Sequence, residues 1–268
     1  MRGITEWDTP QGLHVVRLHY TADPEKRKPE WKDKAMLGMP QADWKAEYEI
    51  DFDVVLGRAY FPEFRSDFHV ASGPIQPIAN YPIGGGWDFG LTPATVHVQL
   101  SPKGQILVLH PESQSWDAGI KRHGGVVQKV RELFFPGFFF KDYGDPAGGS
   151  RAQTDEKTCF EILATEYSIH VAPGPVTQPE RDDPFRDLLT RTTSRGEPMF
   201  LVDPRCKWLI SALSGGYCHK QVMERYLDEP EKNEYSHIVD ALLYVVARLL
   251  KRPERRVKPK NRRRSGQL

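Results

Sequence analysis

Apolar residues gather in short runs between residues 83 and 250, and their spacing changes along the chain. Three consecutive runs have strand length and are rich in apolar and β-branched residues: Ile83–Gly90, Ala94–Leu100 and Gln105–Glu112. The last two are joined by Ser101-Pro-Lys-Gly104, which is typical of a tight turn. The pattern therefore predicts an antiparallel meander of three strands.

After the meander, helical and strand-like patterns alternate. We expect strands over residues 138–145, 168–172 and 199–202, and helices over residues 117–134, 155–166, 184–192 and 204–213. A closing helix is predicted because apolar residues recur at spacings of three and four between Ile238 and Leu250. Three antiparallel strands followed by β-α-β units indicate a mixed α/β sheet flanked by helices. This order resembles the ribonuclease H-like fold.

The first 70 residues have a different character. Gly12–Tyr20 is strand-like, whereas Pro29–Leu37 and Ala42–Ile50 are typical of short helices. A Pro-rich stretch, Gly73–Pro82, marks a boundary. We therefore expect an N-terminal arm or linker over residues 1–70, one ribonuclease H-like domain over 71–250 and a basic, disordered tail over 251–268.

Charge is distributed unevenly. Residues 251–268 hold nine of the 37 Lys and Arg residues and one of the 36 Asp and Glu residues, so the tail has a formal charge of +8 and the rest −7. A basic block of this kind favours a polyanionic partner such as nucleic acid, because phosphate contacts release counterions. The same block is also typical of a solvated tail that only aids solubility.

Cysteine usage and hydropathy bear on location. Cys159, Cys206 and Cys218 have no metal-ligand spacing, which favours a reducing, cytosolic setting. The N-terminus lacks the pattern of a signal peptide. The run Ala241–Ala247 is far shorter than the ~20 residues of a membrane span. We therefore expect no membrane segment.

Three Asp residues lie at positions where a carboxylate is difficult to bury. Asp88 ends an apolar strand, Asp145 ends a later strand, and Asp240 lies beside the apolar stripe of the closing helix. Carboxylates gathered at one place raise each other's pKa unless a cation neutralises them. Oxygen ligands suit Mg²⁺ or Mn²⁺, and two such ions can promote phosphodiester hydrolysis. The trio predicts a site with two metal ions.

Each acid also has a simpler interpretation. Asp88 could form a turn before Gly90, Asp145 could cap a turn before Pro146, and Asp240 could be a solvated edge residue. Asp142 competes with Asp145, and strand alternation places the two on opposite faces, so only one can enter the site. Asp203, before Pro204, is more simply an N-cap.

Several motifs together resemble the nuclease domain of the large terminase subunit of tailed bacteriophages. They are Gly86-Trp-Asp-Phe-Gly90, Tyr143-Gly-Asp-Pro-Ala-Gly148 with Ser150–Thr154 after it, and His237-Ile-Val-Asp-Ala-Leu242. The approach segments Trp44–Phe52 and Ala59–Phe64 resemble that family's linker between ATPase and nuclease halves. The resemblance covers roughly residues 20–250 and depends on the order and spacing of the motifs.

The resemblance implies a two-metal endonuclease that cuts concatemeric viral DNA during genome packaging with little sequence preference. By motif, Asp88, Asp145 and Asp240 would be both catalytic residues and metal ligands, with His237 and Asp142 as secondary candidates. The implied partners are double-stranded DNA, the terminase ATPase domain, the small terminase subunit and the portal, in the host cytoplasm. The printed sequence contains no Gly-x-x-x-x-Gly-Lys-Ser/Thr phosphate loop, so we do not expect ATP-driven packaging by these residues alone.

Two other functions compete with this interpretation. Asp88-Phe-Gly-Leu-Thr92 after a strand also resembles the first phosphate loop of actin-like and sugar-kinase ATPases, although a second such loop is not found in the sequence. A DNA-binding or capsid-docking module is the non-enzymatic alternative, in which the acids are structural and the basic tail makes the contact. That alternative predicts salt-sensitive DNA binding without cleavage.

Overall fold

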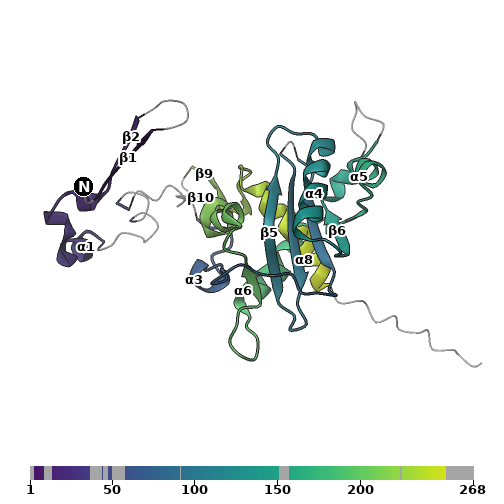
Figure 1. Ribbon diagram of the computed structural model, residues 1–268. Coiled ribbons are helices and arrows are strands. Elements are labelled where there is room, and N and C mark those ends of the chain that lie inside the picture. Colours follow the sequence, from purple (N-terminus) through teal and green to yellow (C-terminus); the bar gives the residue numbers. More distant parts are fainter. Residues whose placement is uncertain are drawn as a thin grey trace, which may run out of the picture.

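The computed structural model describes residues 3–8, 14–36, 44, 48–49, 58–90, 92–150, 157–223 and 225–251. Its centre is a sheet of six strands in the order β7-β6-β3-β4-β5-β8 (Figure 1). Strands β3, β4 and β5 form the predicted antiparallel meander, while β6, β7 and β8 join it in parallel. The bounds are β3 Ile83–Asp88, β4 Ala94–Leu100, β5 Ile106–Gln114, β6 Phe140–Gly144, β7 Val171–Pro173 and β8 Phe200–Val202. The predicted mixed sheet is confirmed.

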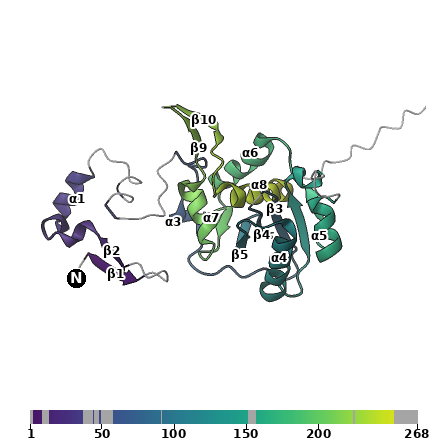
Figure 2. The same ribbon diagram turned by 90° about the horizontal axis from the view of Figure 1, so that it is seen from above.

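Helices cover both faces of this sheet (Figure 2). Helices α6 and α8 pack together on one face, and α4 packs with α5 on the other. The helices are α3 Ser66–His69, α4 Ile120–Phe134, α5 Cys159–Tyr167, α6 Gln178–Thr190, α7 Lys207–Ser211 and α8 Ser236–Leu250, with short turns η3 Pro146–Gly149 and η4 Ala212–Gly216. In the described residues, no helix combines the length and apolar character that a membrane crossing requires.

Helix α8 is the centre of the main hydrophobic core. Residues Ile238–Ala247 are buried almost without interruption, because one side of α8 lies on β3 and β4 and another side packs against α6. The same core takes in Tyr60, Phe61 and Phe64 from the segment before α3. On the opposite face, Trp87 anchors a smaller core with residues of α4 and α5.

Some predicted elements have different bounds. Helix α6 begins at Gln178 rather than near Pro184, because Thr177 and Glu180 form a capping box that starts the helix, and Pro184 lies inside it. Helix α7 begins at Lys207 instead of residue 204. The start of the predicted helix 155–166 and the motif Ser150–Thr154 lie largely outside the described residues.

A hairpin before α8 was not predicted. Strands β9 His219–Val222 and β10 Arg225–Pro230 pair only with each other. Their side chains are mostly exposed, so no alternation of apolar and polar residues reveals them in the sequence. The connection from β10 to α8 nevertheless contributes to the site described below.

The described residues from 3 to 36 form a hairpin and short helical segments. The predicted strand and first helix are confirmed as β2 His14–Leu18 and α1 Pro29–Ala35, while the strand β1 Ile4–Asp8 was not predicted. Two short turns, η1 Tyr20–Ala22 and η2 Glu25–Arg27, connect them. Most of the predicted helix 42–50 and of the motif Trp44–Phe52, and the tail after Lys251, lie outside the described residues.

Candidate active site

The motif Gly86–Gly90 sends successive side chains to opposite faces of the sheet. Trp87 points toward α4, and its indole N–H donates to Asp142 of β6 at 2.7 Å. Asp88 points toward α8 at the end of β3 and is only 7% exposed. Phe89 again lies on the Trp87 side and stacks on its ring, with centroids 6.2 Å apart. The alternation isolates Asp88 as the carboxylate on the α8 face.

Asp88 is paired with His237 from the first turn of α8. The Nδ1 atom of His237 lies 2.8 Å from Oδ2 of Asp88. A Cβ atom at Gly90 would lie 2.9 Å from Cε1 of His237, so the glycine leaves room for this pairing. The bond to Asp88 raises the pKa of His237. His237 and Asp88, which are 149 positions apart, are therefore direct neighbours.

Burial is the main reason that the pKa of Asp88 is raised, and the charges of Asp240 and Asp145 raise it further, while the His237 bond lowers it. The structure thus brings Asp88, Asp145 and Asp240 within electrostatic range of one another. This is the arrangement in which like charges oppose each other's ionisation and a cation would relieve the repulsion.

Asp240 lies one turn after His237 and is 5% exposed. Its Oδ2 atom accepts a 2.7 Å hydrogen bond from the ammonium of Lys232, in the connection between β10 and α8. Its Oδ1 atom lies 3.3 Å from the hydroxyl of Tyr217 and 4.0 Å from Nη1 of Arg181. Asp240 is therefore a buried carboxylate in a close ion pair with Lys232, and not a solvated edge residue.

Asp145 follows β6 at the same end of the sheet. Its backbone N–H donates to the carbonyl of Trp87, which fixes the end of β6 beside the end of β3. Its Oδ1 atom accepts from the N–H of Ala147 at 2.9 Å, so the carboxylate also caps the turn η3. Its charge raises the pKa of Asp88 and of Tyr244. Asp145 can therefore cap η3 and also contribute a negative charge beside Asp88.

Asp142 lies on the opposite face, as strand alternation predicted. Its carboxylate forms a buried ion pair with Arg131 of α4 and accepts the Trp87 indole bond. A Cβ atom at Gly85 would overlap this carboxylate. The structure therefore separates Asp142 from Asp88 and Asp240 by the thickness of the sheet, and gives it a structural partner.

Asp203 lies outside this cluster as well. Its carboxylate accepts from the backbone N–H groups of Ile75 and Arg205 and pairs with the Arg205 guanidinium. It caps the turn before α7 and is not the N-cap itself, since α7 begins at Lys207 after Cys206. The predicted N-cap role of Asp203 is therefore wrong, although these bonds make it a structural residue outside the acid cluster.

Sequence reasoning missed the cations and hydroxyls around Asp240. Lys232, Arg181 and Tyr217 come from three different segments, and each belongs to a stretch without a recognisable motif. Tyr244 had a sequence signal, because it lies one turn after Asp240 on α8. Its ring packs against the guanidinium of Arg181, whose Cζ atom is 5.0 Å from the ring centroid.

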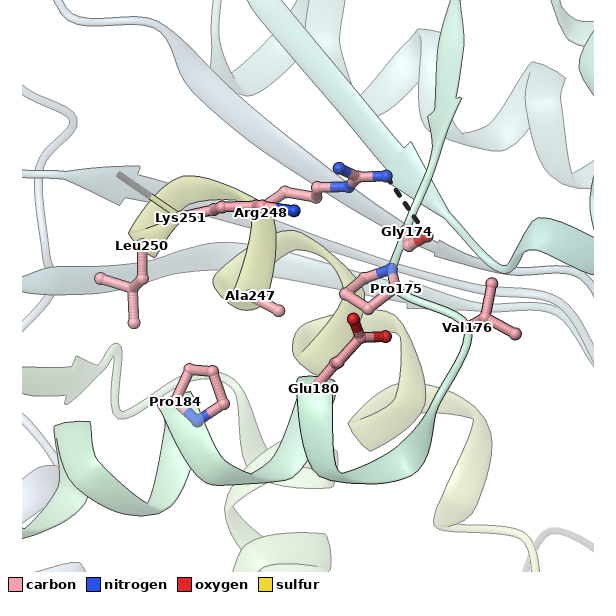
Figure 3. Close-up of a pocket in the computed structure, with 9 residues that line it drawn as sticks. All are labelled: Gly174, Pro175, Val176, Glu180, Pro184, Ala247, Arg248, Leu250 and Lys251. Carbon is pink, nitrogen blue, oxygen red and sulfur yellow. Dashed lines mark hydrogen bonds between the residues drawn. The ribbon is translucent and has the colours of Figure 1, made fainter. Parts of the chain in front are cut away.

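A cavity in the described part of the chain lies between α6 and α8 (Figure 3). It measures about 460 Å³ between the start of α6 and the last turn of α8. Its lining is mixed, with Pro175, Val176 and Leu250 beside Glu180 and Arg248. None of Asp88, Asp145 and Asp240 contributes to it, so we do not regard it as the site of the chemistry.

The donor set at the end of β3 suits a hard cation. Asp88, Asp145 and Asp240 offer carboxylate oxygens, and His237 adds an imidazole. Among the described residues, no three His, Cys, Asp or Glu side chains are arranged to hold a metal ion. In this structure the Lys232 ammonium is bound to Oδ2 of Asp240, and His237 is bound to Oδ2 of Asp88. A metal ion that binds Oδ2 of Asp240 would displace Lys232.

Comparison with solved structures identifies the fold of this chain. No protein-family model and no curated protein matches the chain. The structure is similar to the large terminase of the thermophilic bacteriophage D6E, with a TM-score of 0.55 and 19% identity over 83% of this chain and 52% of that chain. It is also similar to the P22 large terminase nuclease domain, with a TM-score of 0.51 and 14% identity over 70% of this chain and 90% of that domain.

The chain spans about half the length of the D6E terminase but matches nearly all of the P22 nuclease domain. It therefore has the ribonuclease H-like fold of large terminase nuclease domains, which confirms the fold expected from the sequence motifs.

Proposed function

We propose that this chain is a metal-dependent endodeoxyribonuclease that cleaves concatemeric viral DNA during genome packaging, with low sequence specificity. The observation that carries the proposal is the buried Asp88 carboxylate, whose pKa is raised by burial and by the charges of Asp240 and Asp145. Such a cluster is costly unless a cation is bound, and it lies at the carboxyl ends of β3 and β6 in a fold shared with terminase nuclease domains.

Asp88, Asp145 and Asp240 are the proposed ligands of two Mg²⁺ or Mn²⁺ ions, with His237 as an additional candidate. When bound, two such ions supply an activated water and stabilise the leaving oxygen of a phosphodiester. His237 holds the Asp88 carboxylate in place through the 2.8 Å contact. The Tyr217 hydroxyl orients Asp240 from the other side.

The proposed substrate is double-stranded DNA, and the proposed partners are a terminase ATPase domain, the small terminase subunit and the portal, in the host cytoplasm. The D6E terminase, which is about twice as long as the matched region, was solved with ATP-γ-S and with ADP. This supports an ATPase domain as the partner that moves the DNA which the nuclease cuts. The domain limits 71–250 and the tail 251–268 belong to the same proposal.

The test is cleavage of supercoiled plasmid in Mn²⁺, in Mg²⁺ and in EDTA. Wild type should nick and linearise the plasmid only with metal, and Asp88→Asn and Asp240→Asn should each lower the rate by about 100-fold or more. Asp187→Asn is the matched control, because Asp187 is an exposed carboxylate of α6 paired only with Arg191 in the described contacts.

Two results would contradict the proposal. Cleavage that persists in folded Asp88→Asn and Asp240→Asn variants would place the chemistry elsewhere. Folded wild type that binds DNA in a salt-sensitive way but cuts it with neither metal would favour the DNA-binding module, in which the acids serve only as partners of Lys232 and His237.

A further inference from the structure

Arg181 is a nearly buried arginine beside the candidate site. It extends from the first turn of α6 to α8, where Nη1 donates to the Tyr244 hydroxyl at 2.8 Å. The same atom is 4.0 Å from Oδ1 of Asp240. Its neighbour Glu180 lines the cavity of Figure 3, so the side chains of these two consecutive residues of α6 point in different directions. Arg181 thus faces the acid cluster, and Glu180 does not.

The hydrogen bonds of Arg181 are incomplete. Its side chain is 15% exposed, and its buried Nε atom has no hydrogen-bond partner among the described residues. A guanidinium has five N–H donors in a rigid fork, and leaving a buried donor unpaired is unfavourable. The arrangement is therefore one that an added acceptor would complete.

Neutralising Asp240 does not account for this position. Lys232 already forms the close ion pair with Asp240, at 2.7 Å, while Arg181 stays 4.0 Å away. The bond to Tyr244 holds the guanidinium beside the acids without using its remaining donors. A buried cation at this position is explained by an anionic ligand that pairs with Arg181 when it binds to the site.

We infer that Arg181 is a substrate-binding residue that donates to a non-bridging phosphate oxygen of the DNA strand held at Asp88, Asp145 and Asp240. The planar fork of arginine matches the geometry of phosphate, which a lysine ammonium does not. Tyr244 acts as a positioning residue, because its hydroxyl fixes the guanidinium. The inference rests on the proposed nuclease function.

The first test measures DNA binding without cleavage. A short fluorescein-labelled duplex is titrated in Ca²⁺ at several salt concentrations with wild type, Arg181→Gln, Arg181→Lys and Arg191→Gln. Arg191 is the matched control, since it lies at the other end of α6 and pairs with Asp187. Arg181→Gln should reduce the slope of log Kd against log salt by about 0.9, the value for one phosphate contact. Arg191→Gln should leave the slope unchanged.

The second test measures cleavage of plasmid in Mn²⁺ by the same variants. Arg181→Gln should lower the rate by about 100-fold, as expected for one donor to the reacting phosphate. Arg181→Lys should keep the salt slope because it keeps the charge, but recover only part of the rate because it lacks the fork.

The outcomes separate this inference from the proposed function. If wild type cleaves DNA and Arg181→Gln matches Arg191→Gln in both slope and rate, the inference is wrong and the nuclease function stands. A different result is that wild type does not cleave DNA with either metal, while Arg181→Gln, unlike Arg191→Gln, still reduces the salt slope. The phosphate contact then stands and the nuclease function fails.

Discussion

Gly86 of β3 lies directly beneath Ala241 of α8, so that a Cβ atom on Gly86 would overlap the Ala241 carbonyl oxygen. The strand and the helix can therefore approach at backbone distance at this point. Asp88 is two residues along the same face of β3, and Asp240 precedes Ala241. The close approach of two backbones thus sets how near the two carboxylates lie to each other.

Replacement of Gly86 by alanine should destabilise the fold strongly. The added methyl group meets a backbone atom, which cannot move aside as a flexible side chain would, so we expect a loss of about 3 kcal/mol or failure to fold. Thermal unfolding followed by circular dichroism measures this. Gly73→Ala is the control, because a Cβ atom there meets nothing within 4 Å. Equal melting temperatures for the two variants would refute the packing argument.

The meander and α8 could be predicted from the sequence because their patterns are long and regular. The stretch Ile83–Asp88 is fully buried, and α8 carries a continuous apolar stripe, so tertiary packing agrees with local pattern in both. Asp88 and Asp240 could be proposed for the same reason, since each is a carboxylate within a predictable apolar element.

The cations around Asp240 could not be predicted, because their positions depend on long-range packing. Arg181 belongs to α6, which begins at Gln178, about six residues before the predicted start at residue 184. Lys232 follows a hairpin with exposed strands, which has no periodic signal. Neither residue is near Asp88 in sequence, and only the packing of α6 and α8 brings Arg181 to the site.

Asp142→Asn should separate stability from activity. Asp142 and Arg131 form a pair with side chains that are 4% and 10% exposed, and removing one partner of a buried pair costs about 3–5 kcal/mol. The variant should melt at a lower temperature yet still cleave plasmid where it remains folded. Asp145→Asn should instead lose cleavage with a smaller change in melting temperature. Loss of cleavage in folded Asp142→Asn would move Asp142 into the site.

Glu112 of β5 should make the stability of the protein depend on pH. Its two oxygens accept the backbone N–H groups of Trp208 and Leu209, at 2.8 and 3.0 Å, at the start of α7. Burial raises the pKa of Glu112 to about 7 from 4.5, although these bonds lower it. Because the folded-state pKa lies above the unfolded value, the stabilising contribution is present below about pH 4.5 and is lost as the pH rises through about 7.

Glu112→Gln should remove this dependence. Relative to the variant, the free energy of unfolding of wild type should fall by about 3 kcal/mol between about pH 4 and about pH 8. Chemical denaturation at a series of pH values measures the difference. Glu132→Gln, an exposed carboxylate of α4, should give a profile parallel to wild type. A Glu112→Gln profile that also runs parallel to wild type would show that the carboxyl does not titrate differently on folding.

Lys232→Ala should increase the affinity of the protein for Mn²⁺, if the acids form the proposed metal site. The ammonium of Lys232 holds Oδ2 of Asp240 at 2.7 Å, so a metal ion must displace it before that oxygen can bind. Lys232 is 69% exposed, and its removal leaves no buried cavity. We expect about tenfold tighter binding, which corresponds to about 1.4 kcal/mol of additional stabilisation at saturating metal.

The measurement is the rise in melting temperature with increasing Mn²⁺, which reports binding without requiring cleavage. Lys220→Ala is the matched control, because Lys220 pairs with Glu229 within the β9–β10 hairpin and not with a candidate ligand. Asp240→Asn should abolish most of the rise, since it removes a charged oxygen that the ion would bind. Identical Mn²⁺ titrations for Lys232→Ala and Lys220→Ala would mean that the Lys232–Asp240 pair does not compete with the metal, and that the ion is held without this oxygen of Asp240.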